Sequence, residues 1–185
     1  MKSLTQFIKE SQEINESLLG DIIRKLLDTG LSWIEGSVKW IANKSTEAVG
    51  EIWKTHRDVL TNAYSDFRRT YPQYKFLPET PKTPEEYGLA NTAFYYNDNV
   101  SAEHKIDKAN KFISKLLKNK GKPDSIKKFI AIEATDCYVG IIKNPKAATS
   151  DKAKADKFLN NVKSSVDDDT AKLIDSNIKH YIAEM

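Results

Sequence analysis

Cysteine is nearly absent from this 185-residue chain, and long apolar runs are absent altogether. The single cysteine, Cys137, excludes an internal disulfide framework and a multi-cysteine metal site, and it fits a reducing compartment. No apolar run approaches the roughly 18–20 residues that span a bilayer, so we expect no membrane anchor. The start of the chain also lacks the continuous apolar stretch of a secretory signal.

Motifs that mark catalysis or metal binding are missing as well. The seven glycines are scattered singly, which excludes a glycine-rich phosphate loop and a nucleophile elbow. The three histidines form no spaced pair such as His-x-x-x-His, so we expect surface histidines and no metal site. We interpret Cys137 as a small buried hydrophobe, and the nearby Glu133 and Asp136 as a solvated pair on a helix. The sequence therefore predicts no enzyme and no cofactor.

Arginine is missing from the most basic part of the chain. Residues 101–160 contain 14 lysines, no arginine and 7 acidic residues. Bidentate reading of DNA bases usually uses arginine, so this composition indicates either a solvated helical surface or diffuse, non-specific contact with DNA. In the second case the contacting side chains are Lys105, Lys108, Lys111, Lys115 and Lys118. The nearby Phe94-Tyr95-Tyr96 patch is a further candidate, for stacking on exposed bases.

The chain does contain apolar residues at helical spacing along most of its length. Four of the six prolines fall between residues 72 and 84, which excludes helix interior there and predicts an extended strap. After the strap, a helix opens at Thr83-Pro84 with its cap and first-turn proline. The spacing then predicts helices over 101–119, from Asp124 or Ser125 to Asn144-Pro145, and over 150–163 and 168–184.

The predicted fold class is mainly α: amphipathic helices packed as a bundle, with an N-terminal helical arm and a Pro-rich strap. Four regions follow: a targeting or docking helix (1–16), an N-terminal helical region (17–71), a Pro-rich linker (72–84) and a C-terminal helical bundle (85–185). The linker either separates two bodies or crosses one. Among the positions expected to face the core are Ile106, Ala109, Phe112, Ile113, Leu116, Leu117, Ile126, Phe129, Ile130, Cys137, Tyr138, Ile141, Leu173, Ile174, Ile178, Tyr181 and Ile182.

The first 17 residues, MKSLTQFIKESQEINES, combine a short amphipathic pattern with two similar triplets. Leu4, Phe7 and Ile8 share one helical face. Ile8-Lys9-Glu10 and Ile14-Asn15-Glu16 are each followed by serine. Because an isolated helix this short is marginal in water, its apolar edge is expected to become ordered in a partner's groove. We therefore predict Leu4, Phe7 and Ile8 as docking residues.

This opening resembles the capsid-targeting segment of internal head proteins of T-even-type tailed phages. Those proteins begin with Met-Lys-Ser/Thr, followed by Phe-Ile-x-Glu and a small residue, as Met1-Lys2-Ser3 and Phe7 to Ser11 do here. In that family the segment directs the protein into the assembling prohead, and the prohead protease cuts after a Leu/Ile-x-Glu triplet. The resemblance implies processing after Glu10 or Glu16.

These features predict a non-enzymatic structural protein of a tailed-phage virion, internal or capsid-associated, recruited by its N-terminal helix. The expected partners are other virion proteins of the capsid, scaffold or portal region, with non-specific contact to packaged DNA and no metal or membrane. The expected location is the virion, and the host cytoplasm during assembly. One alternative is a small phage effector that binds and inhibits a host defence or transcription protein; a weaker one is a membrane-active protein that uses residues 17–42.

Overall fold

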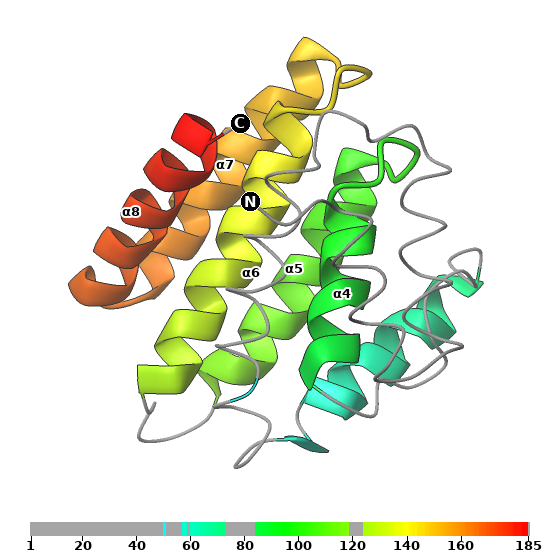
Figure 1. The fold of residues 1–185 in the computed structure, drawn as a ribbon, viewed down its shortest axis with the longest axis vertical. Coiled ribbons are helices and arrows are strands. Elements are labelled where there is room, and N and C mark those ends of the chain that lie inside the picture. Colours follow the sequence, from blue (N-terminus) through cyan, green and yellow to red (C-terminus); the bar gives the residue numbers. More distant parts are fainter. Residues whose placement is uncertain (1–49, 51–56, 59, 73–83, 119–123, 185) are drawn as a thin grey trace, which may run out of the picture.

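The structure is a computed structural model, and it describes residues 50, 57–58, 60–72, 84–118 and 124–184. Within these ranges the regular secondary structure is helical, without a strand, and the helices pack against one another. The predicted all-α bundle is therefore confirmed. The elements are α4 (Pro84–Tyr95), α5 (Ala102–Leu117), α6 (Asp124–Ile142), α7 (Thr149–Ser165) and α8 (Asp168–Glu184), and residues 60–70 form a further helical segment (Figure 1).

Proline and capping side chains set the starts of these helices. α4 begins at Pro84, whose fixed φ suits a first helical turn. The Ser101 hydroxyl accepts a hydrogen bond from the backbone N–H of His104 and so caps α5. Before α8, the Asp167 carboxylate accepts the backbone N–H of Thr170 at 2.9 Å. The hydrogen bonds from Thr170 lower the pKa of Asp167 to about 2.

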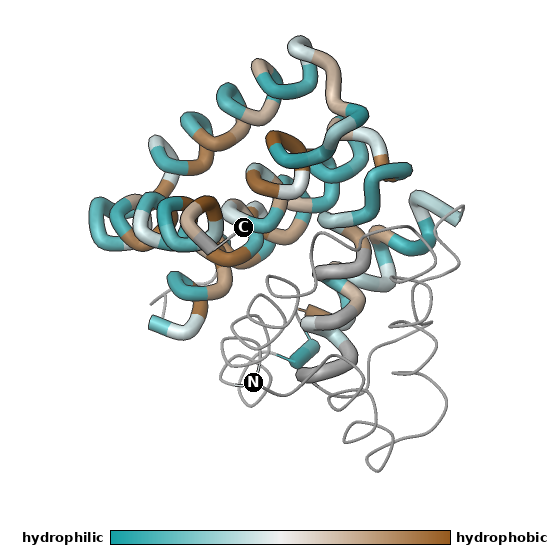
Figure 2. The backbone as a smooth tube through the Cα atoms, turned by 45° about the horizontal axis from the view of Figure 1, so that its top comes forward, coloured by the Kyte–Doolittle hydropathy of each residue, from teal (hydrophilic) through white to brown (hydrophobic). Residues whose placement is uncertain are grey.

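Helix α6 lies at the centre of the bundle, and α4, α5, α7 and α8 all pack against it (Figure 1). Its buried residues run from Ile126 to Ile141 and include an unbroken stretch over 129–137. A helix buried on all sides is expected to be apolar all round, as most of α6 is. Along the outer helices, hydrophilic and hydrophobic positions alternate (Figure 2). None of the helices in the described ranges combines the length and hydropathy that a bilayer crossing needs.

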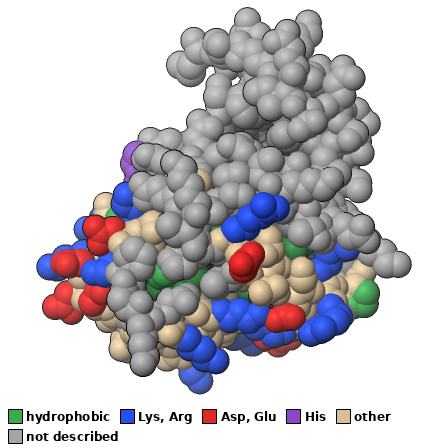
Figure 3. Space-filling view, turned by 90° about the horizontal axis from the view of Figure 1, so that it is seen from below, with side chains coloured by type: hydrophobic (Ala, Val, Ile, Leu, Met, Phe, Trp, Pro, Cys, Tyr) green, Lys and Arg blue, Asp and Glu red, His purple; other side chains and the backbone are tan. Residues whose placement is uncertain are grey.

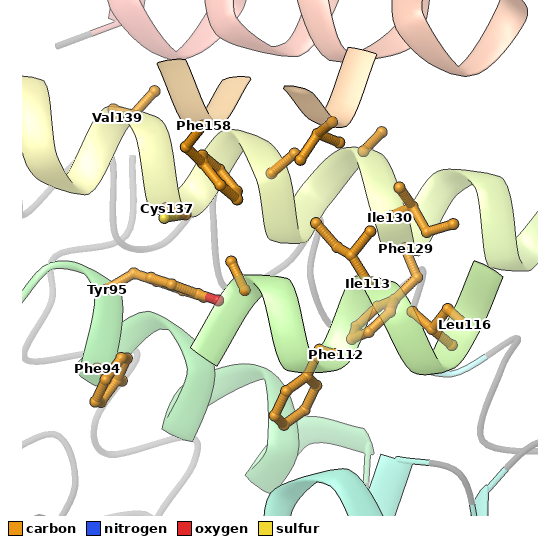
Figure 4. Packing of buried hydrophobic residues seen from close by; sticks show 14 of the residues in the cluster. Phe94, Tyr95, Phe112, Ile113, Leu116, Phe129, Ile130, Cys137, Val139 and Phe158 are labelled. Carbon is orange, nitrogen blue, oxygen red and sulfur yellow. The ribbon is translucent and has the colours of Figure 1, made fainter. Parts of the chain in front are cut away.

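The apolar side chains of these helices form one core cluster, part of which is shown in Figure 4. The positions predicted to face the core are buried or half-buried, with one exception. Ile182 is 43% exposed, so its predicted core position is wrong: it lies in the last turn of α8, at the rim of the bundle.

The helical segment 60–70 belongs to the same core as the C-terminal bundle. Its buried side chains include Tyr64 and Phe67. The Phe67 ring lies edge-on to the ring of Phe94, with 4.9 Å between centroids, and Tyr64 lies 6.1 Å from Tyr87. The two described helical regions on either side of the Pro-rich segment therefore share one core. Residues 73–83 of that segment and the predicted N-terminal arm lie outside the described residues. Pro84, predicted as the end of the linker, is the first residue of α4.

Helix α4 ends directly against α6 at Gly140. A Cβ atom at this position would overlap the carbonyl oxygen of Tyr95 and lie 2.9 Å from its carbonyl carbon. Glycine is therefore the residue that lets the two backbones come this close.

Candidate functional site

The predicted docking and processing residues lie outside the described part of the chain. These are Leu4, Phe7 and Ile8 for docking, and Glu10 and Glu16 for processing. Their roles stay predictions. The lysines predicted to contact DNA, in contrast, are all on α5 or at its end.

Two of these five lysines lie in the core, so the prediction that they contact DNA is wrong. Lys105 is 0% exposed and Lys108 is 1% exposed. The physical reason is their position on the helix. Lys105 lies one turn before Ala109 and Lys108 lies one turn before Phe112, and both of those residues face the core.

The Lys108 ammonium is enclosed by side chains from three helices. Its Nζ atom lies 3.3 Å from Oε2 of Glu133 on α6, and it also donates to Oδ1 of Asn91 on α4. It lies 4.2 Å from the ring centroid of Tyr95 and 4.4 Å from that of Phe112, within cation–π range. Burial lowers the pKa of Lys108, and the Glu133 carboxylate opposes this effect. An ion pair, an amide oxygen and two ring faces thus hold this cation away from water.

Both acids of α6 are buried as well, so the interpretation of Glu133 and Asp136 as a solvated pair is wrong. Each is 0% exposed, because α6 is covered on all sides. Glu133 accepts a hydrogen bond of 2.6 Å from the Tyr95 hydroxyl. Asp136 accepts two longer ones, 3.4 Å each, from Nδ2 of Asn91 and the hydroxyl of Tyr96.

The Asp136 carboxyl group is held largely in its neutral form. Burial and the nearby Glu133 raise the pKa of Asp136 to about 8, against the opposing effects of Lys108 and of the hydrogen bond from Tyr96. A buried carboxyl group beside another carboxylate is expected to keep its proton at pH 7. We call the set of Asn91, Tyr95, Tyr96, Lys108, Glu133, Asp136 and Tyr181 the polar core cluster.

The Phe94-Tyr95-Tyr96 patch forms part of this core, so the prediction that it stacks on exposed bases is wrong. All three side chains are buried. Figure 4 shows the Tyr95 ring extending from the end of α4 toward α5. Burial raises the pKa values of Tyr95 and Tyr96 well above the usual range, and the carboxyl groups of Glu133 and Asp136 add to this. Both hydroxyls therefore stay protonated and donate to carboxyl oxygens.

Cys137 lies buried beside the cluster, as the sequence predicted. Burial raises the pKa of its thiol well above the usual value, which makes it a poor nucleophile in the closed bundle. In the ranges that the structure covers, no group of three or more His, Cys, Asp or Glu side chains is arranged to hold a metal ion.

Lys105 places a second ammonium in the core, at a different point. Its Nζ atom donates to the backbone carbonyl of Gly140 at 2.8 Å. Gly140 lies close to the C-terminal end of α6, where the helix dipole favours a cation. Burial lowers the pKa of Lys105 to about 8. This lysine therefore stabilises the end of α6.

The outer lysines of α5 are engaged by acidic partners. Lys111 Nζ lies 2.9 Å from Oδ2 of Asp107, and Lys115 pairs with Asp66 of the segment 60–70. The hydrogen bond and charge of Lys115 lower the pKa of Asp66. Lys118 is exposed. On the face that Figure 3 shows, basic and acidic side chains are intermixed rather than gathered by sign. DNA contact through Lys111, Lys115 and Lys118 stays a prediction. To contact DNA, Lys111 and Lys115 would first have to break their ion pairs with Asp107 and Asp66.

Tyr71 fastens the segment 60–72 to the same face of α5. Its hydroxyl donates to Asp107, its ring centroid lies 4.9 Å from Lys111 Nζ, and its ring packs 4.7 Å from that of His104. His104, which we interpreted as a surface histidine, is thus half-buried under Tyr71.

A cavity of about 260 Å³ lies between the α4–α5 loop, the start of α5, the α6–α7 loop and α7. Ion pairs and hydrogen bonds join its walls: Lys154 Nζ lies 2.8 Å from Glu103 Oε1, and Lys146 Nζ donates to Asn99 Oδ1 at 2.9 Å. The first contact joins α7 to α5, and the second ties the α6–α7 loop to the α4–α5 loop.

Asn91 was not singled out from the sequence, although it links Lys108 to Asp136. The signal that would have found the cluster is a polar residue at an inward helical position. Glu133 lies one turn after Phe129 and one turn before Cys137, both of them predicted core residues. A charged residue at such a position is taken for a surface residue as long as the helices that cover it are not known.

No family model, curated protein or solved structure matches this chain. Its own residues therefore carry the functional assignment.

Proposed function

We propose that this chain is a non-enzymatic component of a tailed-phage particle, internal or capsid-associated, which its N-terminal segment recruits. The observation that carries the proposal is the opening Met1-Lys2-Ser3 with Phe7-Ile8-Lys9-Glu10-Ser11, which resembles a capsid-targeting segment with a processing triplet. The apolar edge of that segment suits docking in a groove of a capsid, scaffold or portal protein.

The chemistry of the body supports a structural role. The side chains with catalytic potential, Glu133, Asp136, Lys108 and Cys137, are buried inside the bundle. The first three use their hydrogen bonds to join helices. The exposed lysine Lys118 and the paired outer lysines leave room for weak, salt-dependent contact with packaged DNA.

The test is incorporation into particles made by the phage that encodes the chain. Deletion of residues 2–10, or combined alanine substitution of Leu4, Phe7 and Ile8, is expected to abolish incorporation and leave the body folded. A matched control changes Thr5, Gln6 and Lys9 to alanine, in the same segment but off its apolar edge, and should be incorporated normally.

Processing is tested by mass spectrometry of the N-terminal peptide from purified particles. Glu10→Gln and Glu16→Gln should each block cleavage at their own site. Glu184→Gln is the control, because Ile182-Ala183-Glu184 has the same triplet pattern but ends helix α8. Unchanged incorporation of the deletion variant would overturn the recruitment role. Absence from particles, with a stoichiometric host-protein complex in infected cells, would favour the inhibitory effector instead.

A further inference from the structure

The polar core cluster holds one ammonium group for two carboxyl groups. Lys108 Nζ lies 3.3 Å from Glu133, and this is the ion pair of the cluster. The hydrogen bonds to Asp136 come from neutral donors, the amide of Asn91 and the hydroxyl of Tyr96. Lys105, the other buried lysine, directs its ammonium to the Gly140 carbonyl. The charges balance in the closed bundle when one carboxyl group carries a proton.

The groups around Glu133 and Asp136 supply no further positive charge that could take the place of that proton. α4 and the residue after it contribute tyrosine hydroxyls, α5 contributes the two lysines, α6 contributes a thiol, and α8 contributes one tyrosine. The buried side chains of α7 are apolar. All of the facing titratable groups other than the two lysines are neutral acids that would add negative charge on ionisation. They are Tyr87, Tyr95, Tyr96, Cys137 and Tyr181.

We infer that the polar core cluster is a proton-operated lock: a proton on the Asp136 carboxyl group keeps the C-terminal end of α4 attached to α6, and its release to a base in solution loosens this attachment.

The loosening follows from the surroundings of the carboxylate that would form. It would lie one helical turn from the Glu133 carboxylate, in a site closed to water, where repulsion between like charges is poorly screened. The hydrogen bonds that it receives from Asn91 on α4 and from Tyr96, the residue after α4, are long, at 3.4 Å each. Opening of the cluster admits water to both carboxylates and relieves this repulsion. The pKa of Asp136 is raised from 3.8 to about 8 in the closed bundle, so opening becomes more favourable as the pH rises through this range and changes no further above about pH 8.

The chain carries its own probe of this opening, because its single cysteine, Cys137, lies buried beside Asp136 on α6. A thiol reagent modifies Cys137 only when the helices around it separate. The experiment measures the labelling rate of the folded full-length chain between pH 6 and pH 9, for the wild type and for Asp136→Asn. The ratio of the two rates removes the intrinsic pH dependence of the thiol.

The wild-type rate divided by the Asp136→Asn rate should rise by up to about tenfold per pH unit toward pH 8 and then level off. Asp156→Asn, an exposed aspartate on α7, should keep the wild-type profile. Glu133→Gln removes the repelling carboxylate but leaves Asp136 buried, so its profile should level off at a lower pH than that of the wild type. If Asp136→Asn fails to fold, this lower levelling point is the readout. A ratio that stays constant from pH 6 to pH 9 would overturn the lock.

Discussion

Lys108 and Glu133, 25 residues apart in the chain, form an ion pair of 3.3 Å in the centre of the bundle, with side chains that are 1% and 0% exposed. The pair joins α5 to α6, and through Asn91 and Tyr95 it reaches α4. A buried pair of this kind costs desolvation of both charges, so its net contribution to stability is modest. Its effect on specificity is larger, because any packing that separates the two leaves a charge buried alone.

Substitution of one member of this ion pair should lower the free energy of unfolding far more than the pair as a whole contributes to it. Lys108→Met or Glu133→Gln alone should lower the free energy of unfolding by about 3–5 kcal/mol. The double variant should lose less than the sum of the two, with a coupling within about 0.5–3 kcal/mol. Urea unfolding measures all three. The exposed pair Lys154 and Glu103 is the control, and its cycle should show little coupling. Additive losses at Lys108 and Glu133 would contradict the pairing.

Lys105 should make stability rise with pH in alkaline solution. Its pKa is about 8 in the folded chain and 10.5 for an unperturbed lysine, so between these pH values the unfolded chain binds more protons. The free energy of unfolding, taken relative to Lys105→Met, should therefore increase from pH 8 to pH 10.5, by at most about 1.4 kcal/mol per pH unit. It should be flat from pH 6 to pH 7. If the free energy of unfolding of the wild type relative to Lys105→Met falls with rising pH, the Lys105 ammonium is not desolvated.

Gly140→Ala should destabilise the bundle, because the new methyl group meets the backbone of Tyr95 and α4 must shift. Overpacking of this kind costs about 1–3 kcal/mol. Gly50→Ala is the matched control: Gly50 is also helical, and a Cβ there meets nothing within 4 Å. That change should leave stability unchanged or raise it by about 0.5–1 kcal/mol. Thermal unfolding monitored by circular dichroism compares the two, and equal effects would contradict the close approach of α4 to α6.

Phe67→Ala tests whether the segment 60–70 shares the core of the C-terminal bundle. The Phe67 ring is fully buried against Phe94, so truncation should cost about 3–5 kcal/mol. Unfolding should stay a single transition, followed by tyrosine fluorescence and by far-ultraviolet circular dichroism. Ile182→Ala, at a 43% exposed position, should have a much smaller effect. A second transition that affects only part of the helical signal would show two separate cores.

The helices of the bundle could be predicted from the sequence because their signals are local. Helix ends are marked by Pro84, by Asn144-Pro145 and by the acidic run at the start of α8. The apolar spacing in between matches α5 and α8 closely. The polar core cluster could not be predicted in the same way. Lys108 and Asp136 look like surface residues until it is known that α4 lies across them, and that contact joins residues up to 45 positions apart.

The central position of α6 has a consequence for synthesis of the chain. While the ribosome is still making the segment after Ile142, α6 lacks the partners α7 and α8 that cover its outer side. The sequence of α6 is apolar on that side too. The nascent chain therefore exposes a hydrophobic surface until about forty more residues have emerged. Truncated products that end near Asn144 should therefore aggregate or recruit chaperones.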